Sequence, residues 1–133
     1  MLEELKIADV VIGAVYVPAD LAPKIIKKQD LELMKQGSVI VDISIDQGGI
    51  LETSKTTSIS NPTFIENGVV HYCVPNMPAL APRTATINLN RAVMPWLETL
   101  LETKDPTKEK YLSTGIVTYQ GQILNKVVEK ALS

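Results

Sequence analysis

The sequence predicts an α/β fold with a parallel sheet, and three stretches of the chain support this prediction. Asp9–Val17 contains an uninterrupted apolar run rich in β-branched residues, which favours a strand buried on both faces. Ile25–Lys35 has the apolar spacing of a short helix, and Ser38–Ile43 is a second apolar strand. A strand, a helix and a strand joined by short loops form a right-handed βαβ unit, so we expect the two strands to be parallel.

Residues with special backbone preferences mark the ends of these elements. Pro18 ends the first strand because proline has no N–H to donate to a neighbouring strand. Asp30 can cap the helix, and Gly37 follows the helix at the position where a left-handed backbone favours glycine. Local chemistry and the apolar pattern therefore predict the same boundaries.

A hairpin is predicted after the βαβ unit. Thr63–Ile65 and Val69–Val74 flank Asn67-Gly68, and Asn-Gly is a strong hairpin signal because both residues tolerate a positive φ. The longer arm, Val69–Val74, is the third candidate strand of the sheet.

The C-terminal part of the chain is predicted to be mostly helical. Arg83–Glu102 has helical spacing, and its apolar residues, Trp96 among them, are expected in a core or a subunit interface. Pro95 removes a backbone donor, so we expect a kink or two helices that meet near Met94. Shorter elements follow, and they are a strand at Gly115–Tyr119, a turn at Gly121 and an amphipathic helix at Asn125–Leu132.

Composition and charge narrow the classes of function. The chain has 133 residues, of which 45% are hydrophobic and 21% charged, as in a globular domain. Its formal net charge of -2 gives no electrostatic reason to expect nucleic acid or an anionic membrane as a partner. The single cysteine, the acidic N-terminus and the lack of an apolar run near the ~20 residues that cross a bilayer predict a cytoplasmic protein.

Three strand ends are expected to meet at one edge of the sheet, and this edge is the candidate site. They are Val15-Tyr16, Ser44-Ile45-Asp46 and Val74–Met77. Ligands of open α/β sheets bind beyond the carboxyl ends of the strands, and the two glycines after Gln47 let backbone approach a ligand closely. Taken alone, each strand end is explained by an ordinary turn as well as by a ligand site. Asp46 alone is explained equally well as a helix cap or as a surface acid.

Taken together, these segments resemble the alanine dehydrogenase family. The motif Ile45-Asp46-Gln47-Gly48-Gly49 carries the resemblance most specifically, with His71-Tyr72-Cys73-Val74 and Asn76-Met77-Pro78. The related proton-translocating transhydrogenase shares the fold but differs at the acid-Gln-Gly-Gly loop. Other matching segments appear in the family's order, and they are Ala8–Val15, Ala22-Pro23-Lys24, Glu52-Thr53-Ser54, Pro82-Arg83-Thr84 and Thr118–Gly121.

The resemblance implies that the chain is about the last third of the enzyme. Residues 1–80 then correspond to the second half of a doubly wound, Rossmann-type parallel sheet in the NAD-binding domain, and residues 81–133 to C-terminal helices of the catalytic domain. No Gly-x-Gly-x-x-Gly turn and no ribose-binding acid follow a predicted strand. By the same resemblance, the catalytic histidine and the substrate lysine and arginine come from a domain outside this sequence.

The resemblance also implies the activity, the reversible oxidative deamination of L-alanine to pyruvate and ammonia with NAD. Asp46 is then the catalytic acid beside the nicotinamide, where a carboxylate can take or relay a proton. No metal site is assigned. The residues that match NAD-contacting positions of the family are Val15, Tyr16, Ile43, Ser44, Ile45, Asp46, Val74, Pro75, Asn76 and Met77.

Two classes of function are open at this point. The chain is either part of an alanine dehydrogenase that needs a companion chain, or a non-catalytic remnant or nucleotide-binding module of the same family. A piece of the transhydrogenase alpha subunit is a further alternative. The resemblance implies a hexamer for the complete enzyme. Because Asp9–Val17 would lack a neighbouring strand on one side, we expect the chain to associate with itself or with a partner.

Several polar residues are given structural interpretations. His71 and Cys73 lie in an apolar strand, so we expect a structural histidine and an inert thiol. Asp42 lies within the second strand, where it either faces a structural partner or is out of place in an apolar strand. Lys55 stands where the family often has arginine, and lysine cannot make the same bidentate contact with an anion. Arg83 is either a phosphate or subunit contact or a solvated side chain.

Overall fold

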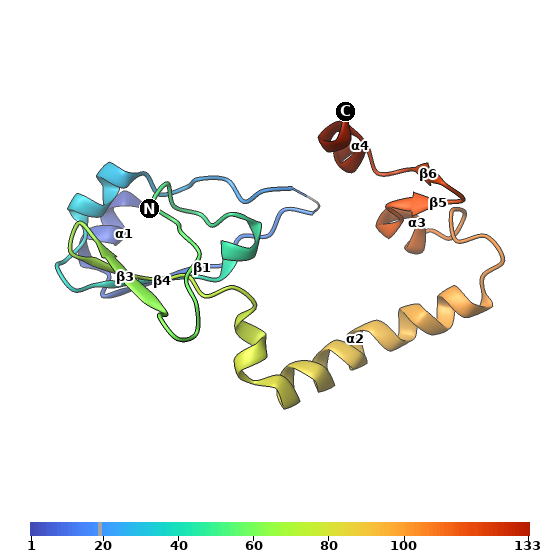
Figure 1. Cartoon of the computed structure of the whole chain (residues 1–133), viewed down its shortest axis with the longest axis horizontal. Helices are drawn as coiled ribbons and strands as arrows, with labels where there is room; N and C mark the ends of the chain where they lie inside the picture. The colour runs from blue at the N-terminus through green and yellow to red at the C-terminus, as the bar shows by residue number, and fades with distance from the viewer. Residues whose placement is uncertain (19) are drawn as a thin grey trace. The chain divides into compact units, whose positions relative to one another are not determined.

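The computed structural model describes residues 1–18 and 20–133 and divides the chain into two compact units, Met1–Met77 and Pro78–Ser133 (Figure 1). The division falls close to the one predicted at residue 80. The assignment of the two parts to different domains of a larger enzyme stays a prediction.

The first unit is built on a four-stranded sheet with the order β1-β2-β4-β3. β1 (Val10–Gly13), β2 (Val39–Asp42) and β4 (Val69–Tyr72) are parallel, whereas β3 (Thr63–Glu66) runs antiparallel to β4. The β3–β4 hairpin turns at Asn67-Gly68, whose φ angles are 49° and 75°. The predicted α/β fold is confirmed, and the short arm of the hairpin adds an antiparallel edge to the sheet.

β1 is shorter than the predicted strand Asp9–Val17. Beyond β1, backbone groups bond to side chains of the 3-10 helix η2 (Ile43–Gln47) instead of to a neighbouring strand. The N–H of Val15 donates to Ser44 Oγ (2.7 Å), and the N–H of Val17 donates to Gln47 Oε1 (3.2 Å). β1 therefore ends at Gly13, because the N–H groups of Val15 and Val17 bond to these side chains and not to a neighbouring strand.

The connection between β1 and β2 contains a shorter helix than the predicted one at Ile25–Lys35. It is a 3-10 helix, η1 (Lys28–Leu33). The first two residues of the predicted helix both donate their N–H to the carbonyl of Ile50, at 2.7 and 3.1 Å, and Ile26 forms an isolated parallel β-bridge with Leu51. This stretch is therefore extended and not helical. Asp30 caps η1 as predicted, because its Oδ2 accepts from the N–H of Lys27 (2.9 Å).

The first unit has a hydrophobic core of its own. A short N-terminal helix, α1 (Leu2–Ile7), which the sequence analysis does not predict, packs beside η1 and buries Leu5. Burial of one leucine or isoleucine side chain contributes about 1.5–3 kcal/mol. The core residues come from α1, η1, the sheet and the loops between them, and they are Leu5, Ala22, Ile26, Leu31, Met34, Ile40, Ile50, Leu51 and Val69.

β1 forms an open edge of the sheet, as predicted. It pairs with β2, and among the described residues no strand pairs with its other side. Val10 is 58% exposed and Ile12 is 65% exposed. An edge strand without a charged residue or proline is a template on which another strand can pair.

The second unit contains one long helix, α2 (Pro82–Glu102). Pro95 is accommodated inside this single helix, so the alternative of two helices that meet near Met94 is wrong. Because α2 is exposed, water can bond to the carbonyl that proline leaves without a donor. The flanking elements are η3 (Met77–Leu80), α3 (Leu112–Gly115), β5 (Thr118–Tyr119), β6 (Gln122–Ile123) and α4 (Lys126–Leu132).

The predicted turn at Gly121 and the predicted last helix are confirmed. Gln120 and Gly121 have φ angles of 48° and 80° and join β5 to β6 in an antiparallel hairpin. Asn125 caps α4, since its side chain accepts from the N–H groups of Val127 (3.0 Å) and Val128 (3.2 Å).

The second unit differs from the first in that none of residues 78–133, all of them described, is buried. At 100° per residue, the large apolar side chains of α2 spread over about half of the helix circumference. An apolar face this wide is typical of a helix that packs against other elements. Its residues are Ile87, Leu89, Val93, Met94, Trp96, Leu97, Leu100 and Leu101, and all are exposed or half-buried.

No helix in the described part of the chain is both long and apolar enough to cross a membrane. Nor do three His, Cys, Asp or Glu side chains of residues 1–18 and 20–133 lie together as the ligands of a metal ion would.

Candidate functional site

The carboxyl ends of β1, β2 and β4 lie at one edge of the sheet because the three strands are parallel. The segments that follow them, residues 14–17, 43–47 and 74–77, are the three predicted strand ends. Hydrogen bonds between side chains and backbone connect the first segment to the second and the second to the third. The predicted convergence of the three segments is therefore present.

Asp46 lies in the second segment, in the 3-10 helix η2 (Ile43–Gln47) that starts directly after β2. Its side chain is exposed, and both carboxylate oxygens accept from the N–H of Asn76, Oδ1 at 3.2 Å and Oδ2 at 3.0 Å. Asn76 has a φ of 51°, a conformation that asparagine adopts more readily than most residues. This turn brings the third segment to the Asp46 carboxylate.

Ser44 connects the first segment to the second. Its Oγ accepts from the N–H of Val15 (2.7 Å) and donates to the carbonyl of the same residue (2.8 Å). Ser44 is 4% exposed, so these bonds are largely shielded from water. Loss of the partner of a buried polar group costs about 1–3 kcal/mol of stability. The two bonds of Ser44 therefore hold the first and second segments together.

Gln47 is a site residue that is not among those predicted from the sequence. Its carboxamide accepts from the N–H of Val17 (3.2 Å) and donates to the carbonyls of Val17 (2.7 Å) and Asp20 (3.1 Å). Both ends of the carboxamide thus hold the segment after β1 against η2. The sequence feature that could identify Gln47 as a site residue is its position directly after Asp46 in the glycine-rich motif.

A cavity of about 290 Å³ lies at this edge of the sheet. Pockets for small ligands usually measure about 300–1,000 Å³, so the cavity suits a ring-sized part of a ligand and not a whole dinucleotide. Its lining is mostly apolar, and its polar groups are the hydroxyls of Tyr16 and Ser44, one carboxylate and one carboxamide. The lining residues are Ala14, Val15, Tyr16, Ile43, Ser44, Asp46 and Gln47.

The predicted cofactor-contacting residues fall into three groups. Five of them line the cavity, namely Val15, Tyr16, Ile43, Ser44 and Asp46. Two are buried in the first unit, Ile45 (6% exposed) and Val74 (1% exposed). The other three lie outside the lining, and they are Pro75, Asn76 and Met77. Contact with NAD stays a prediction for all ten.

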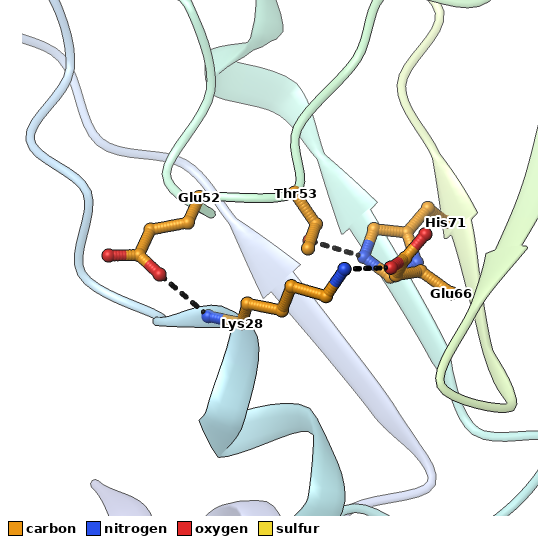
Figure 2. A network of polar contacts seen from close by, with 5 residues as sticks. All are labelled: Lys28, Glu52, Thr53, Glu66 and His71. Atoms are coloured by element: carbon orange, nitrogen blue, oxygen red, sulfur yellow. Dashed lines mark hydrogen bonds and ion pairs between the residues drawn. The ribbon is translucent and has the colours of Figure 1, made fainter.

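His71 belongs to a polar network (Figure 2), none of whose residues lines this cavity. It is fully buried, its Nδ1 lies 3.0 Å from the carbonyl of Val69, and its Nε2 lies 2.9 Å from Thr53 Oγ1. Because a carbonyl only accepts, Nδ1 carries a proton and donates it. The ring stacks on Phe64 with centroids 4.7 Å apart. Both nitrogens are engaged within the protein, as in a structural histidine.

Lys28 and Glu66 form an exposed ion pair in the same network, with Nζ and Oε1 2.6 Å apart (Figure 2). The N–H of Lys28 also donates to Glu52 (2.9 Å). The hydrogen bond and the charge of Lys28 lower the pKa of Glu66, and those of Glu66 raise the pKa of Lys28. Lys55, at the position where the family often has arginine, lies over the Phe64 ring with Nζ 4.6 Å from its centroid.

Cys73 and Asp42 are both fully buried. Burial raises the pKa of the Cys73 thiol, which keeps it protonated and unreactive. Asp42 ends β2, and its Oδ2 accepts from the N–H of Ile50 (3.0 Å) and from Ser54 Oγ (2.7 Å). Of the two interpretations left open for Asp42, the structure supports the one with a structural partner.

A larger cavity, of about 810 Å³, lies wholly within the second unit. Its lining offers no carboxylate, amine or imidazole that could transfer a proton near neutral pH. We therefore place the candidate site in the first unit. The residues that line the larger cavity are Trp96, Leu100, Pro106, Tyr111, Leu112, Thr114, Gly115, Ile116, Thr118 and Tyr119.

Sequence comparisons identify relatives for nearly the whole chain. The family model described as alanine dehydrogenase/PNT, C-terminal domain, matches residues 1–126. The alanine dehydrogenase of Staphylococcus haemolyticus (strain JCSC1435) is 46% identical over 131 residues. Alanine dehydrogenase 2 of Staphylococcus aureus (strain USA300) is 45% identical over 133 residues. Each match covers 96% of this chain but 35% of the relative, so the chain spans about a third of their length.

Structural comparisons agree with the sequence comparisons. A solved structure described as L-alanine dehydrogenase has a TM-score of 0.81 and 38% identity, and the match covers 98% of this chain and 37% of that chain. The crystal structure of transhydrogenase from Sinorhizobium meliloti has a TM-score of 0.73 and 22% identity, over 92% of this chain and 34% of that chain. At this lower identity, the second likeness concerns the fold alone.

Proposed function

The chain belongs to the alanine dehydrogenase/PNT family, and from this premise we propose that it forms the nicotinamide side of the active site of an NAD-dependent alanine dehydrogenase. In the proposed reaction, L-alanine, NAD and water give pyruvate, ammonia and NADH, and the reaction is reversible. We propose that the chain acts in the cytoplasm, since its single cysteine suits a reducing compartment.

The position of Asp46 carries this proposal. Its carboxylate lines the cavity, is exposed, and is oriented by the N–H of Asn76. A carboxylate has about four acceptor positions, so both oxygens keep the capacity to take a proton while they hold this bond. We assign to Asp46 the proton transfers that accompany imine chemistry at the substrate carbon.

The residues around Asp46 suit the nicotinamide end of NAD. When bound, NAD would supply the hydride acceptor. The apolar side chains of Val15 and Ile43, with the body of Tyr16, would cover the ring and exclude water from it. Ser44 would keep these walls in place through its bonds to Val15. The size of the cavity fits a ring and leaves the rest of the dinucleotide to other parts of the enzyme.

We further propose that activity requires the part of the alanine dehydrogenase relatives that this chain does not cover. Expressed as a chain of its own for the experiments below, this part is called the companion polypeptide. The chain has no Gly-x-Gly-x-x-Gly turn for the pyrophosphate. A doubly wound sheet has the strand order 3-2-1-4-5-6, in which β1 would be the fourth strand and its open edge would pair with the first. The wide apolar face of α2 offers a second surface for the same partner.

The alternative function is a non-catalytic member of the family. The observation that favours it is the 35% coverage of the relatives, since residues 1–133 do not include the substrate residues that the family resemblance implies. Under this alternative the cavity binds a nucleotide or nothing, and Asp46 moves no proton.

An activity assay separates the two functions. The chain is purified alone and co-expressed with the companion polypeptide from the Staphylococcus haemolyticus enzyme, and NADH formation from L-alanine is recorded. We expect no turnover for the chain alone and saturable turnover for the assembly, with the companion polypeptide alone as the control. An assembled complex without turnover contradicts the enzymatic proposal.

A further inference from the structure

Two charged residues outside the cavity lining, Lys24 and Asp42, hold the loop that follows Asp46. The loop runs from Gly48 to Ile50, directly after η2. Gly48 and Gly49 have φ angles of 90° and 79°, which only glycine adopts without strain. Their N–H groups return to the carbonyls of Ile45 (2.9 Å) and Ser44 (3.0 Å) and close the end of η2.

Lys24 bonds to this loop on its carbonyl side. Its Nζ donates to the carbonyl of Gly48 at 2.6 Å and to that of Gly49 at 2.9 Å. Hydrogen bonds from an ammonium group are stronger than neutral ones, and the carbonyls at the C-terminal end of a helical turn attract a cation. A lysine fixed at two carbonyls loses side-chain entropy, and the two bonds must offset that loss for the contact to persist.

Asp42 bonds to the loop on its amide side. Its Oδ2 accepts from the N–H of Ile50 (3.0 Å) and from Ser54 Oγ (2.7 Å). The loop backbone lies directly against this carboxylate, because a Cβ at Gly49 would collide with Asp42 Oδ2 and with Ser54. Oδ1 of Asp42 is buried without a partner in the described part of the chain. A buried carboxylate in this state is costly, which favours a role other than general stabilisation.

We propose that Lys24 and Asp42 are positioning residues for Asp46. Together they fix the Gly48–Ile50 loop from opposite sides, the loop fixes the end of η2, and η2 holds the Asp46 carboxylate at the N–H of Asn76. Neither residue lines the cavity. The role of Asp46 in this inference rests on the proposed function. The restraint on the Gly48–Ile50 loop does not, because it follows from the hydrogen bonds within this chain.

The restraint is tested by amide hydrogen exchange on the full chain. Lys24→Met removes the cation and keeps the length of the side chain. It is expected to raise the exchange rates of the Gly48, Gly49 and Asn76 amides at least about tenfold, since their bonds depend on the held loop. Lys24→Arg, which still donates to carbonyls, should restore rates to within about threefold of the original.

A matched substitution controls for the loss of a surface lysine. Lys35→Met breaks the exposed Lys35–Asp9 ion pair (2.7 Å) and should leave these amides unchanged. Ser54→Ala, which removes one donor from Asp42, should raise the exchange rate of the Ile50 amide. Rates in Lys24→Met that match those of Lys35→Met would overturn the proposed restraint.

The consequence for Asp46 is tested in the assembly with the companion polypeptide. Lys24→Met should lower kcat about tenfold or more while KM for NAD stays within about threefold, because displacement of a reacting group by an ångström can cost about 100-fold. Lys24→Arg should recover most of kcat. An unchanged kcat in Lys24→Met overturns the positioning role. An inactive wild-type assembly contradicts the proposed function instead, and the exchange experiment still decides whether the restraint exists.

Discussion

Ile40 in the first unit is fully buried, whereas Leu101 in the second unit is 78% exposed, and the same contrast holds for the two units as a whole. The first unit packs a core between its sheet, α1 and η1. The second unit displays the apolar face of α2 and buries none of its residues. The contrast indicates that the first unit can hold the Asp46 site by itself, while the second unit has no buried residue of its own. We propose that the companion polypeptide covers the apolar face of α2.

The largest expected difference between the units is in folding stability. Ile40→Ala should lower the free energy of unfolding of the full chain by about 2–5 kcal/mol, because it leaves a cavity in a packed core. Leu101→Ala should change it by less than about 0.5 kcal/mol, as for other surface sites. Urea titration of both variants measures the two values. Equal losses would show that the second unit also has a core.

A second prediction concerns chemistry located in the first unit. In the assembly with the companion polypeptide, Asp46→Asn should lower kcat about 100-fold or more, since asparagine keeps the size of the side chain but cannot take a proton. NAD binding should change far less. Steady-state kinetics with L-alanine and a direct NAD titration measure both effects. A turnover within a few-fold of the unsubstituted assembly would remove Asp46 from the proton-transfer role.

The sequence predicts the parts of the first unit that depend on local patterns. The apolar runs locate β1, β2 and β4, and Asn67-Gly68 locates the hairpin. The extent of β1 and the type of η1 are not predictable in this way. They depend on bonds from Ser44, Gln47 and Ile50 to residues more than twenty positions away, and no local pattern encodes such partners.

The same difference between local patterns and distant partners applies to the candidate site. The strand ends and the acid are visible in the sequence because of their order and their glycines. The bonds of Lys24 to the loop are not, because a lone lysine has no periodicity and its partners are backbone carbonyls. Pro95 illustrates the limit of a local rule, since a proline is tolerated inside α2, where the exposed backbone can bond to water.

A third prediction sharpens the contrast at the apolar face of α2. Trp96→Ala should leave the stability of the chain alone nearly unchanged, because the side chain is 49% exposed. The same substitution should weaken binding of the companion polypeptide by about 2 kcal/mol, roughly 30-fold, as expected for an aromatic residue at the centre of an interface. Isothermal titration of the two polypeptides provides the measurement. Loss of stability without loss of binding would show that Trp96 packs within the second unit and does not contribute to the interface.

The smallest expected effect is the pH dependence of the exposed Lys28–Glu66 pair. The pKa of Glu66 is lowered by the hydrogen bond and charge of Lys28. The contribution of the pair to stability is therefore present above the ordinary carboxyl pKa and is lost as the pH falls through the lowered pKa of Glu66. Glu66→Gln should therefore lower the stability near neutral pH and remove its dependence on pH in the acidic range, and added salt should reduce the difference between the two chains. Thermal melts from neutral to acidic pH compare the two chains.

Sedimentation velocity tests most directly the central claim that the chain is completed by another polypeptide. The open edge of β1 and the uncovered face of α2 predict that the sedimentation coefficient of the chain alone rises with concentration. They also predict that the companion polypeptide moves with the chain in a single faster boundary. A chain that stays a folded monomer over a wide concentration range, and that sediments separately from the companion polypeptide, would contradict the claim.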